Sequence, residues 1–310
     1  MSANILSGKS IADAIKAEVA VEVATLREVH GFSPCLVVVR VGEDPASSVY
    51  VASKVKTAND LGIISEHLHF ADDVSQEEIV SVVEQLNQRS NVDGILVQLP
   101  LPRHIDEREI LEQIDPEKDV DGFHPINTGR LTQGYPSLAP CTPAGVIEIL
   151  KRSGIEIAGS HAVIVGRSNI VGKPMAALLL REHATVTICH SRTKNLPEIS
   201  RSADILVAAI GRAGFIRDAH IGRGSTVIDV GINNISDPER LSEFFDGDEL
   251  SKRLTAIEKR GFTLVGDVNP KEAMEKAANF TPVPGGVGLL TVAMLMKNTV
   301  EATKMRRKLD

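Results

Sequence analysis

Short apolar runs alternate with longer amphipathic stretches along most of the chain. Cys35–Val41 and Gly94–Leu99 are apolar enough for buried strands, whereas Ser10–Val29 and Ser75–Ser90 have the three- and four-residue spacing of helices. Strands that alternate with helices in this way predict βα units and therefore parallel sheets. The pattern indicates an α/β fold whose first lobe, rich in βα units, ends near residue 140.

In the second half of the chain a strand, a tight loop and a helix start follow one another directly. Ala162–Val165 is apolar, Gly166 ends this run, and Gly172-Lys173-Pro174 opens a series of helix formers. A glycine at a strand end allows close backbone approach, and a helix N-terminus attracts an anion such as a pyrophosphate. Ser168 replaces the second glycine of the usual fingerprint, so this motif alone favours a dinucleotide site and a plain structural turn equally.

The strands that follow favour the dinucleotide site. Thr185–Cys189 leads into His190-Ser191-Arg192-Thr193, which lacks the Asp or Glu that binds ribose hydroxyls in NAD sites. A hydroxyl beside a guanidinium suits a 2′-phosphate, so NADP is favoured over NAD. Ile205–Ala209 and Thr226–Val230 each lead to a glycine, as a Rossmann-like, doubly wound parallel sheet requires. The alternative is an α/β core whose glycines serve only in turns.

The first lobe has polar residues at positions where chemistry could occur. Tyr50 and Lys54 are four residues apart on a predicted helix and share a face, although a solvated lysine beside a half-buried tyrosine is the more ordinary interpretation. Gln98 ends an otherwise apolar strand, where it would bind a ligand or cap a loop. Asp119 and Asp121 lie in a turn-rich loop, either as acidic or hydrogen-bonding groups of a site or as turn formers.

Composition narrows the classes of partner. The 310 residues suffice for two domains, and a net charge of −7 favours neither nucleic acid nor an anionic membrane as partner. We find no signal peptide and no apolar run long enough to span a bilayer. Cys35, Cys141 and Cys189 have neither disulfide nor zinc spacing, so we expect no metal and a reducing, cytoplasmic location.

Six motifs, in order, resemble those of one family over nearly the whole chain: Tyr50-x-x-x-Lys54, Asp93–Pro102, Lys118–Phe123, Pro140–Pro143, Gly166–Pro174 and Thr281–Gly288. The chain resembles the bifunctional methylenetetrahydrofolate dehydrogenase / methenyltetrahydrofolate cyclohydrolase family. The resemblance implies NADP-dependent oxidation of 5,10-methylenetetrahydrofolate and hydrolysis of the methenyl product to 10-formyltetrahydrofolate at the same site. It also implies a homodimer and a cleft between two lobes. We assign residues 1–140 and the C-terminal helix 289–310 to a catalytic folate-binding domain, and residues 141–288 to an NADP-binding domain.

The resemblance further implies roles for individual residues. Lys54 corresponds to the catalytic lysine, Gln98 to the partner that tunes it, Tyr50 to the residue that stacks on folate, and Asp121 to the carboxylate that binds the pterin ring. A lysine shielded from water can act as a base near neutral pH. The other implied folate contacts are Leu99, Pro100, Pro284, Gly285, Gly286 and Val287, and the implied NADP contacts are Gly166, Arg167, Ser168, Ser191, Arg192 and Ile232.

The chain departs from the family pattern in two places. The charged stretch 236–261 is longer than the short hairpin expected there, and Leu289-Leu290 stands where the family usually has Pro-Met. The first departure affects the rim of the NADP site or a partner contact, and the second is a packing variant near the folate pocket. Two other functions stay open: an NADP-dependent reductase of another small substrate, with Lys54 and Asp121 serving a carbonyl, and a dinucleotide-sensing module without catalysis. Folate-dependent reduction of NADP distinguishes all three.

Overall fold

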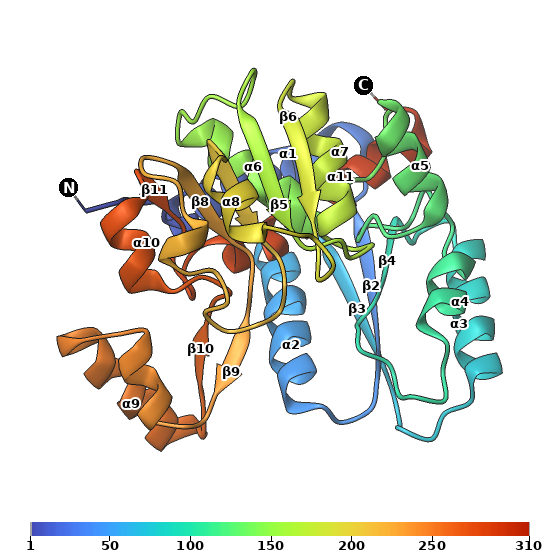
Figure 1. The fold of residues 1–310 in the computed structure, drawn as a ribbon. Helices are drawn as coiled ribbons and strands as arrows, with labels where there is room; N and C mark the ends of the chain where they lie inside the picture. Colours follow the sequence, from blue (N-terminus) through green and yellow to red (C-terminus); the bar gives the residue numbers. More distant parts are fainter. Residues whose placement is uncertain (1, 310) are drawn as a thin grey trace. The chain divides into compact units, whose positions relative to one another are not determined.

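The computed structural model describes residues 2–309, apart from the side chains of Pro45, Ala46 and Val49 (Figure 1). The chain forms two compact units. Unit 1 comprises residues up to Ile11 and Thr142–Thr291, and unit 2 comprises Ala12–Cys141 and the residues from Val292 onward. Two long helices, α1 (Gly8–His30) and α11 (Val287–Arg307), contribute residues to both units. No helix within residues 2–309 combines the length and the apolar content needed to cross a membrane.

Unit 2 is built on a three-stranded parallel sheet in the order β3-β2-β4. The central strand β2 (Cys35–Val41) is buried throughout because both β3 (Ile64–Phe70) and β4 (Gly94–Val97) flank it. Its Val39 lies opposite Leu68 on one side and Val97 on the other. The helices of this unit are α2 (Pro45–Asp60), α3 (Gln76–Gln88), α4 (Glu107–Gln113) and α5 (Pro125–Gln133), and α3 and α4 pack side by side (Figure 1).

Unit 1 contains a six-stranded parallel sheet in the order β1-β11-β8-β7-β5-β6. The strands are β1 (Asn4–Ile5), β5 (His161–Val165), β6 (Thr185–Cys189), β7 (Ile205–Ala208), β8 (Thr226–Asp229) and β11 (Asn279–Phe280). The chain runs from β5 outward to β6, then returns past β5 to β7, so the strand order reverses between β5 and β7. This is the doubly wound arrangement predicted from the sequence, and the reversal is where such sheets bind nucleotides.

The other elements of unit 1 are α6 (Cys141–Arg152), α7 (Gly172–Arg181), α8 (Leu196–Arg201), η1 (Asp218–His220) and α10 (Pro270–Lys276). The stretch 236–261 folds as an insertion with its own core. It lies between the antiparallel strands β9 (Asn233–Ile235) and β10 (Thr263–Val265) and contains η2 (Glu239–Glu243) and α9 (Gly247–Arg260). Its core consists of the buried Leu241, Phe244 and Phe245 together with Ile235 of β9 and Val265 of β10.

The first residues of the chain group differently from our assignment, which placed residues 1–140 in one domain. β1 pairs with β11 at the edge of the six-stranded sheet, and residues up to Ile11 therefore belong to unit 1. A strand of two residues has no readable alternation of apolar and polar positions, so the sequence could not place it. The division of substrates between the two predicted domains stays a prediction.

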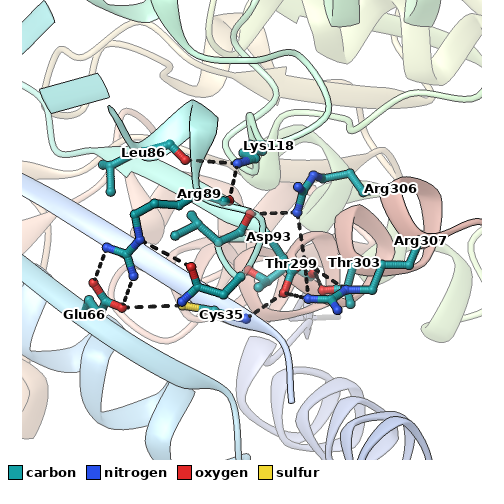
Figure 2. A network of polar contacts seen from close by, with 12 residues as sticks. Cys35, Glu66, Leu86, Arg89, Asp93, Lys118, Thr299, Thr303, Arg306 and Arg307 are labelled. Carbon is teal, nitrogen blue, oxygen red and sulfur yellow. Dashed lines mark hydrogen bonds and ion pairs between the residues drawn. The ribbon is translucent and has the colours of Figure 1, made fainter. Parts of the chain in front are cut away.

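A buried polar network in unit 2 connects the end of α11 to the sheet (Figure 2). Asp93, directly before β4, is fully buried and accepts hydrogen bonds from Arg306 Nη1 at 3.0 Å, Arg307 Nη2 at 3.0 Å and the Cys35 backbone N–H at 3.0 Å. Nearby, the Lys118 ammonium donates to the carbonyls of Leu86, Asn87 and Arg89, at the C-terminal end of α3. Asp93 and Lys118 therefore stabilise the fold. Both belong to motifs on which the family resemblance rests.

Candidate active site

Close backbone contacts explain the two glycines of the loop between β5 and α7. Gly166 has φ +136°, and a Cβ there would lie 2.1 Å from the Ala209 carbonyl oxygen at the end of the neighbouring strand β7. A Cβ on Gly172 would lie 2.4 Å from the Gly166 carbonyl oxygen. Any side chain at either position would push these segments apart. The loop thus leaves backbone exposed where the strand order of the sheet reverses.

Ser168, which replaces the second glycine of the usual fingerprint, holds the turn directly before α7. Its hydroxyl oxygen accepts from the backbone N–H groups of Val171 at 3.2 Å and Gly172 at 3.3 Å. These are orphan donors of a helix N-terminus, so the hydroxyl fixes the loop in its tight shape. The side chains of Arg167 and Ser168 are exposed at this edge.

The neighbouring strand β6 ends in a tight turn that exposes Ser191 and Arg192. The His190 N–H donates to Thr193 Oγ1 at 2.8 Å, and the Arg192 N–H donates to His190 Nδ1 at 3.1 Å. Because β5 and β6 are paired and parallel, this turn lies at the same edge of the sheet as Gly166. Hydroxyl and guanidinium groups without an adjacent carboxylate fit the additional phosphate of NADP.

Two buried carboxylates, which the sequence interpretation missed, hold the remaining loops of this edge. Asp267 accepts from the backbone N–H groups of Ile210 at 2.5 Å, Gly211 at 2.9 Å and Arg212 at 2.8 Å. Asp229, at the end of β8, accepts from the N–H groups of Gly231 at 3.0 Å and Val268 at 3.0 Å. Burial raises the pKa of Asp229 to about 8, and these backbone donors act in the opposite direction. The two carboxylates stabilise the turns after β7 and β8, of which the second carries the half-exposed Ile232.

In unit 2, Lys54 and Gln98 meet at the carboxyl edge of the sheet. Lys54, on α2, is only 9% exposed, and its Nζ donates to Gln98 Oε1 at 2.9 Å. The Gln98 backbone N–H donates to the Val39 carbonyl at 2.8 Å, and its side-chain Nε2 donates to the Leu99 carbonyl at 2.6 Å. The amide orientation is therefore fixed, with its oxygen toward the lysine.

Asp121 lies near this pair, while Asp119 has a structural role. Burial raises the pKa of the half-buried Asp121 to about 6, and the charge of Lys54 acts in the opposite direction. Asp119 is buried and accepts from the N–H groups of Gly122 at 3.1 Å and His124 at 2.8 Å, which makes it the turn former of this loop. Its pKa is raised by burial.

Asn298 positions the Asp121 loop from α11. Its Nδ2 donates to the Val120 carbonyl at 2.8 Å and to the Ala139 carbonyl at 2.8 Å. No clear sequence signal pointed to this role, because Asn298 stands between the polar residues Lys297 and Thr299. Tyr50 lies one turn before Lys54 on α2 and is 42% exposed, which leaves its ring accessible for stacking.

The predicted folate contacts belong to both units. Leu99 packs against the core of unit 2, and Pro100 after it is exposed. The segment 281–288, which we call the folate loop, belongs to unit 1. Within it, Gly285 has φ +109° and its carbonyl accepts from the Gly8 N–H at 2.8 Å. A Cβ on Gly286 would lie 2.6 Å from the Pro282 carbonyl oxygen, so this backbone also needs glycine.

The chemistry available in unit 2 is proton transfer, and that in unit 1 is dinucleotide binding. A buried amine held by an amide, near a carboxyl group whose pKa burial raises to about 6, can take a proton from water and return it. The glycine-containing loop, the N-terminus of α7 and the exposed Ser191 and Arg192 fit a phosphorylated dinucleotide. Within residues 2–309 no cluster of metal-ligating side chains occurs.

Models of two domains from one family match the chain. The profile of the tetrahydrofolate dehydrogenase/cyclohydrolase catalytic domain matches residues 6–121, and that of the tetrahydrofolate dehydrogenase/cyclohydrolase NAD(P)-binding domain matches residues 140–307. The chain is 56% identical over 307 residues to the bifunctional protein FolD of Koribacter versatilis, covering 99% of each chain. It is 48% identical over 309 residues to the FolD protein of Acetivibrio thermocellus, covering all of both.

Solved structures are similar over the same extent. The chain superposes on the bifunctional FolD enzyme of Campylobacter jejuni with a TM-score of 0.88 at 41% identity, covering 98% of this chain and 100% of the other. The FolD enzyme of Trypanosoma brucei, solved with NADP and an inhibitor, gives a TM-score of 0.87 at 38% identity, with 98% of each chain covered. These matches confirm the two-lobe α/β fold and the dinucleotide-binding lobe predicted from the sequence.

Proposed function

This chain belongs to the tetrahydrofolate dehydrogenase/cyclohydrolase family, and we propose that it uses Lys54, Gln98, Tyr50 and Asp121 to oxidise 5,10-methylenetetrahydrofolate and to hydrolyse the methenyl product to 10-formyltetrahydrofolate. The observation that carries the proposal is the 2.9 Å hydrogen bond from Nζ of the buried Lys54 to Gln98 Oε1. Unlike the buried Lys118, whose Nζ is bonded to three backbone carbonyls, Lys54 has a side-chain amide as its partner and lies near the Asp121 carboxyl group, so we assign it to proton transfer.

In the hydrolytic step Lys54 accepts a proton from the water that attacks the methenyl carbon, and it later donates a proton to the departing ring nitrogen. Gln98 holds the amine toward the substrate through its fixed amide oxygen. Asp121 accepts hydrogen bonds from the pterin ring, and Tyr50 stacks on the folate. Leu99, Pro100 and the folate loop contribute the remaining surface for the substrate.

NADP, when bound, supplies the hydride acceptor of the oxidation. We assign its binding to the backbone around Gly166, to Arg167, Ser168, Ser191 and Arg192, and to Ile232. The backbone cradle takes the pyrophosphate, and Ser191 and Arg192 take the 2′-phosphate through charge-assisted hydrogen bonds.

One assay tests the proposed activity. Purified protein is incubated with methylenetetrahydrofolate and either NADP or NAD, and formation of reduced cofactor and decay of the methenyl compound are followed separately. Folate-dependent reduction of NADP is the expected result. Reduction of NADP by a hydroxy acid would instead indicate a reductase of another small substrate, and NADP binding without turnover would indicate a sensing module.

Replacing Arg192 by alanine tests the cofactor site. Loss of a charge-assisted phosphate contact costs about 1.5–3 kcal/mol, so we expect KM for NADP to rise roughly ten- to a hundredfold. KM for NAD should change by less than about twofold, because NAD lacks that phosphate. Arg181→Ala, which removes an exposed arginine from the end of α7, is the matched control. Equal losses for both cofactors in Arg192→Ala would contradict the assignment.

The titration of Asp121 predicts a pH dependence of folate binding. Its pKa is raised to about 6, so the carboxyl group is protonated below that pH and ionised above it. Only the ionised form offers full acceptor strength to the pterin N–H groups. We expect KM for methylenetetrahydrofolate to fall as pH rises through about 6, and Asp121→Asn to have a weaker, flat profile over the same range. If KM rises below about pH 6 to the same extent in the unmutated protein and in Asp121→Asn, the pH dependence belongs to another group.

We also propose that the protein is a homodimer in a reducing compartment such as the cytoplasm. The strand β3 lies at the edge of its sheet with Ile64 53% exposed, which offers a second copy a strand to pair with. The cysteines are all free and buried, as a reducing environment allows. Light scattering of the purified protein should give twice the chain mass of 33.3 kDa.

A further inference from the structure

The side chain of Arg253 reaches from the insertion 236–261 to the folate loop. Arg253 lies in the middle of α9, yet its side chain is only 12% exposed, because it turns inward instead of toward solvent. Its Nη1 donates to the Leu264 carbonyl in β10 at 2.7 Å, and its Nη2 donates to the Val283 carbonyl in the folate loop at 3.2 Å. One guanidinium thus connects the insertion, its closing strand and the folate loop.

The insertion holds this guanidinium in a defined orientation. Nε donates to Glu249 Oε1 at 2.7 Å, one turn earlier on α9, and the guanidinium carbon lies 4.5 Å from the centre of the Phe245 ring. Phe245 belongs to the small core of the insertion. An arginine paired with a carboxylate and stacked on an aromatic ring loses few additional conformations when it bonds a carbonyl. The contact with Val283 is therefore preorganised.

Val283 is the middle of three points at which unit 1 holds the folate loop. At the start, the Asp229 N–H donates to Thr281 Oγ1 at 2.7 Å, and further on the Gly8 N–H donates to the Gly285 carbonyl at 2.8 Å. Pro282 and Pro284 flank Val283 and have no N–H groups with which to fix the backbone themselves. Between the two outer points, the position of the backbone depends on what bonds the Val283 carbonyl.

We propose that Arg253 is a positioning residue for folate binding, and that the insertion 236–261 serves as the support that holds the Val283–Gly285 backbone in its substrate-binding position. The inference rests on the proposed role of the folate loop. It explains why a stretch rich in charged residues forms a core of its own beside this loop. Arg253 itself does not touch the reacting atoms in this proposal.

The test compares Arg253→Met with Arg253→Lys and with Lys252→Met as the matched control. Lys252 is the neighbouring residue on α9, with a side chain that is 74% exposed. We expect Arg253→Met to raise KM for methylenetetrahydrofolate about tenfold while KM for NADP changes less than about twofold. Arg253→Lys should recover part of the loss, since an ammonium reaches one carbonyl but cannot bridge two. Lys252→Met should behave as the unmutated protein.

Hydrogen exchange of the peptide that covers residues 281–290 provides a readout that does not depend on catalysis. Loss of the Val283 contact should speed exchange of its amides by about tenfold in Arg253→Met and leave it unchanged in Lys252→Met. Unchanged exchange overturns the proposal whether or not the unmutated protein turns over folate. Faster exchange with an unchanged KM for folate, or with equal increases in both KM values, also overturns it, because Arg253 would then be only structural.

Discussion

Lys54→Met is expected to lower the rate of methenyltetrahydrofolate hydrolysis by about two to four orders of magnitude, which is the contribution of a positioned acid or base. Reduction of NADP should suffer less. Hydride leaves the methylene carbon as a delocalised cation forms, with no obligatory proton transfer to the protein. Attack of water on that cation must release a proton, and the ring nitrogen must later receive one. Methenyltetrahydrofolate should therefore accumulate in the mutant, which measurements of both steps with added substrates would detect.

Two further variants separate the chemical role of Lys54 from a structural one. Gln98→Ala removes the acceptor at 2.9 Å from Nζ and should reduce hydrolysis in the same direction, by a smaller factor. Lys56→Met removes an exposed lysine from the same helix and should leave both steps unchanged. If Lys54→Met folds and hydrolyses the methenyl compound at the unmutated rate, the general base lies elsewhere, with Asp121 the next candidate.

Where local signals were strong, the sequence predicted the fold well. The buried strands β2, β4, β5, β7 and β8 are runs of apolar, mostly β-branched residues, which only a sheet covered on both faces accommodates easily. Gly166 and Gly172 each allow a close contact between backbones, whereas the predicted close approach of a ligand to Gly166 stays a prediction. At such positions the residue type and its immediate neighbours are enough to predict the local structure.

Long-range contacts were not predictable from these signals. The carboxylate of Asp267 bonds a turn more than fifty residues earlier in the chain, and Asn298 bonds carbonyls of Val120 and Ala139. Such bonds satisfy buried backbone groups, and their partners emerge only when the strands are placed. The core of the insertion 236–261 was hidden for a similar reason, since its few apolar residues are scattered among charges.

The motifs of the resemblance mix residues of two kinds, which the sequence could not separate. In the Asp93–Pro102 motif, Gln98 meets Lys54 at the carboxyl edge of the sheet, whereas Asp93 at the other end of β4 is buried among arginines. In Lys118–Phe123, Asp121 lies beside Lys54, while Lys118 bonds three carbonyls at the end of α3. One end of each motif therefore carries residues that we propose for catalysis, and the other end carries a residue that stabilises the fold.

This separation predicts that Asp93→Ala destabilises unit 2 by about 3–5 kcal/mol, the usual cost of removing one partner from a buried ion pair. The mutation would leave the buried Cys35 N–H without its acceptor at 3.0 Å and would remove the carboxylate that Arg306 and Arg307 share (Figure 2). Arg306 would retain the Val92 carbonyl at 2.7 Å, and Arg307 would retain the Phe32 ring at 3.8 Å, so the end of α11 should loosen without detaching.

Urea unfolding of the variants measures this effect. Asp93→Asn keeps an acceptor oxygen for the Cys35 N–H but loses the charge, so its stability should lie between those of Asp93→Ala and the unmutated protein. The control is Arg108→Ala, which breaks a pair with Glu112 in which the arginine side chain is 84% exposed, and which should leave the urea midpoint unchanged. If the free energy of unfolding of Asp93→Ala lies within about 1 kcal/mol of that of the unmutated protein, α11 is held chiefly by its apolar contacts. The ion pairs of Asp93 with the two arginines would then contribute no more than a surface pair does.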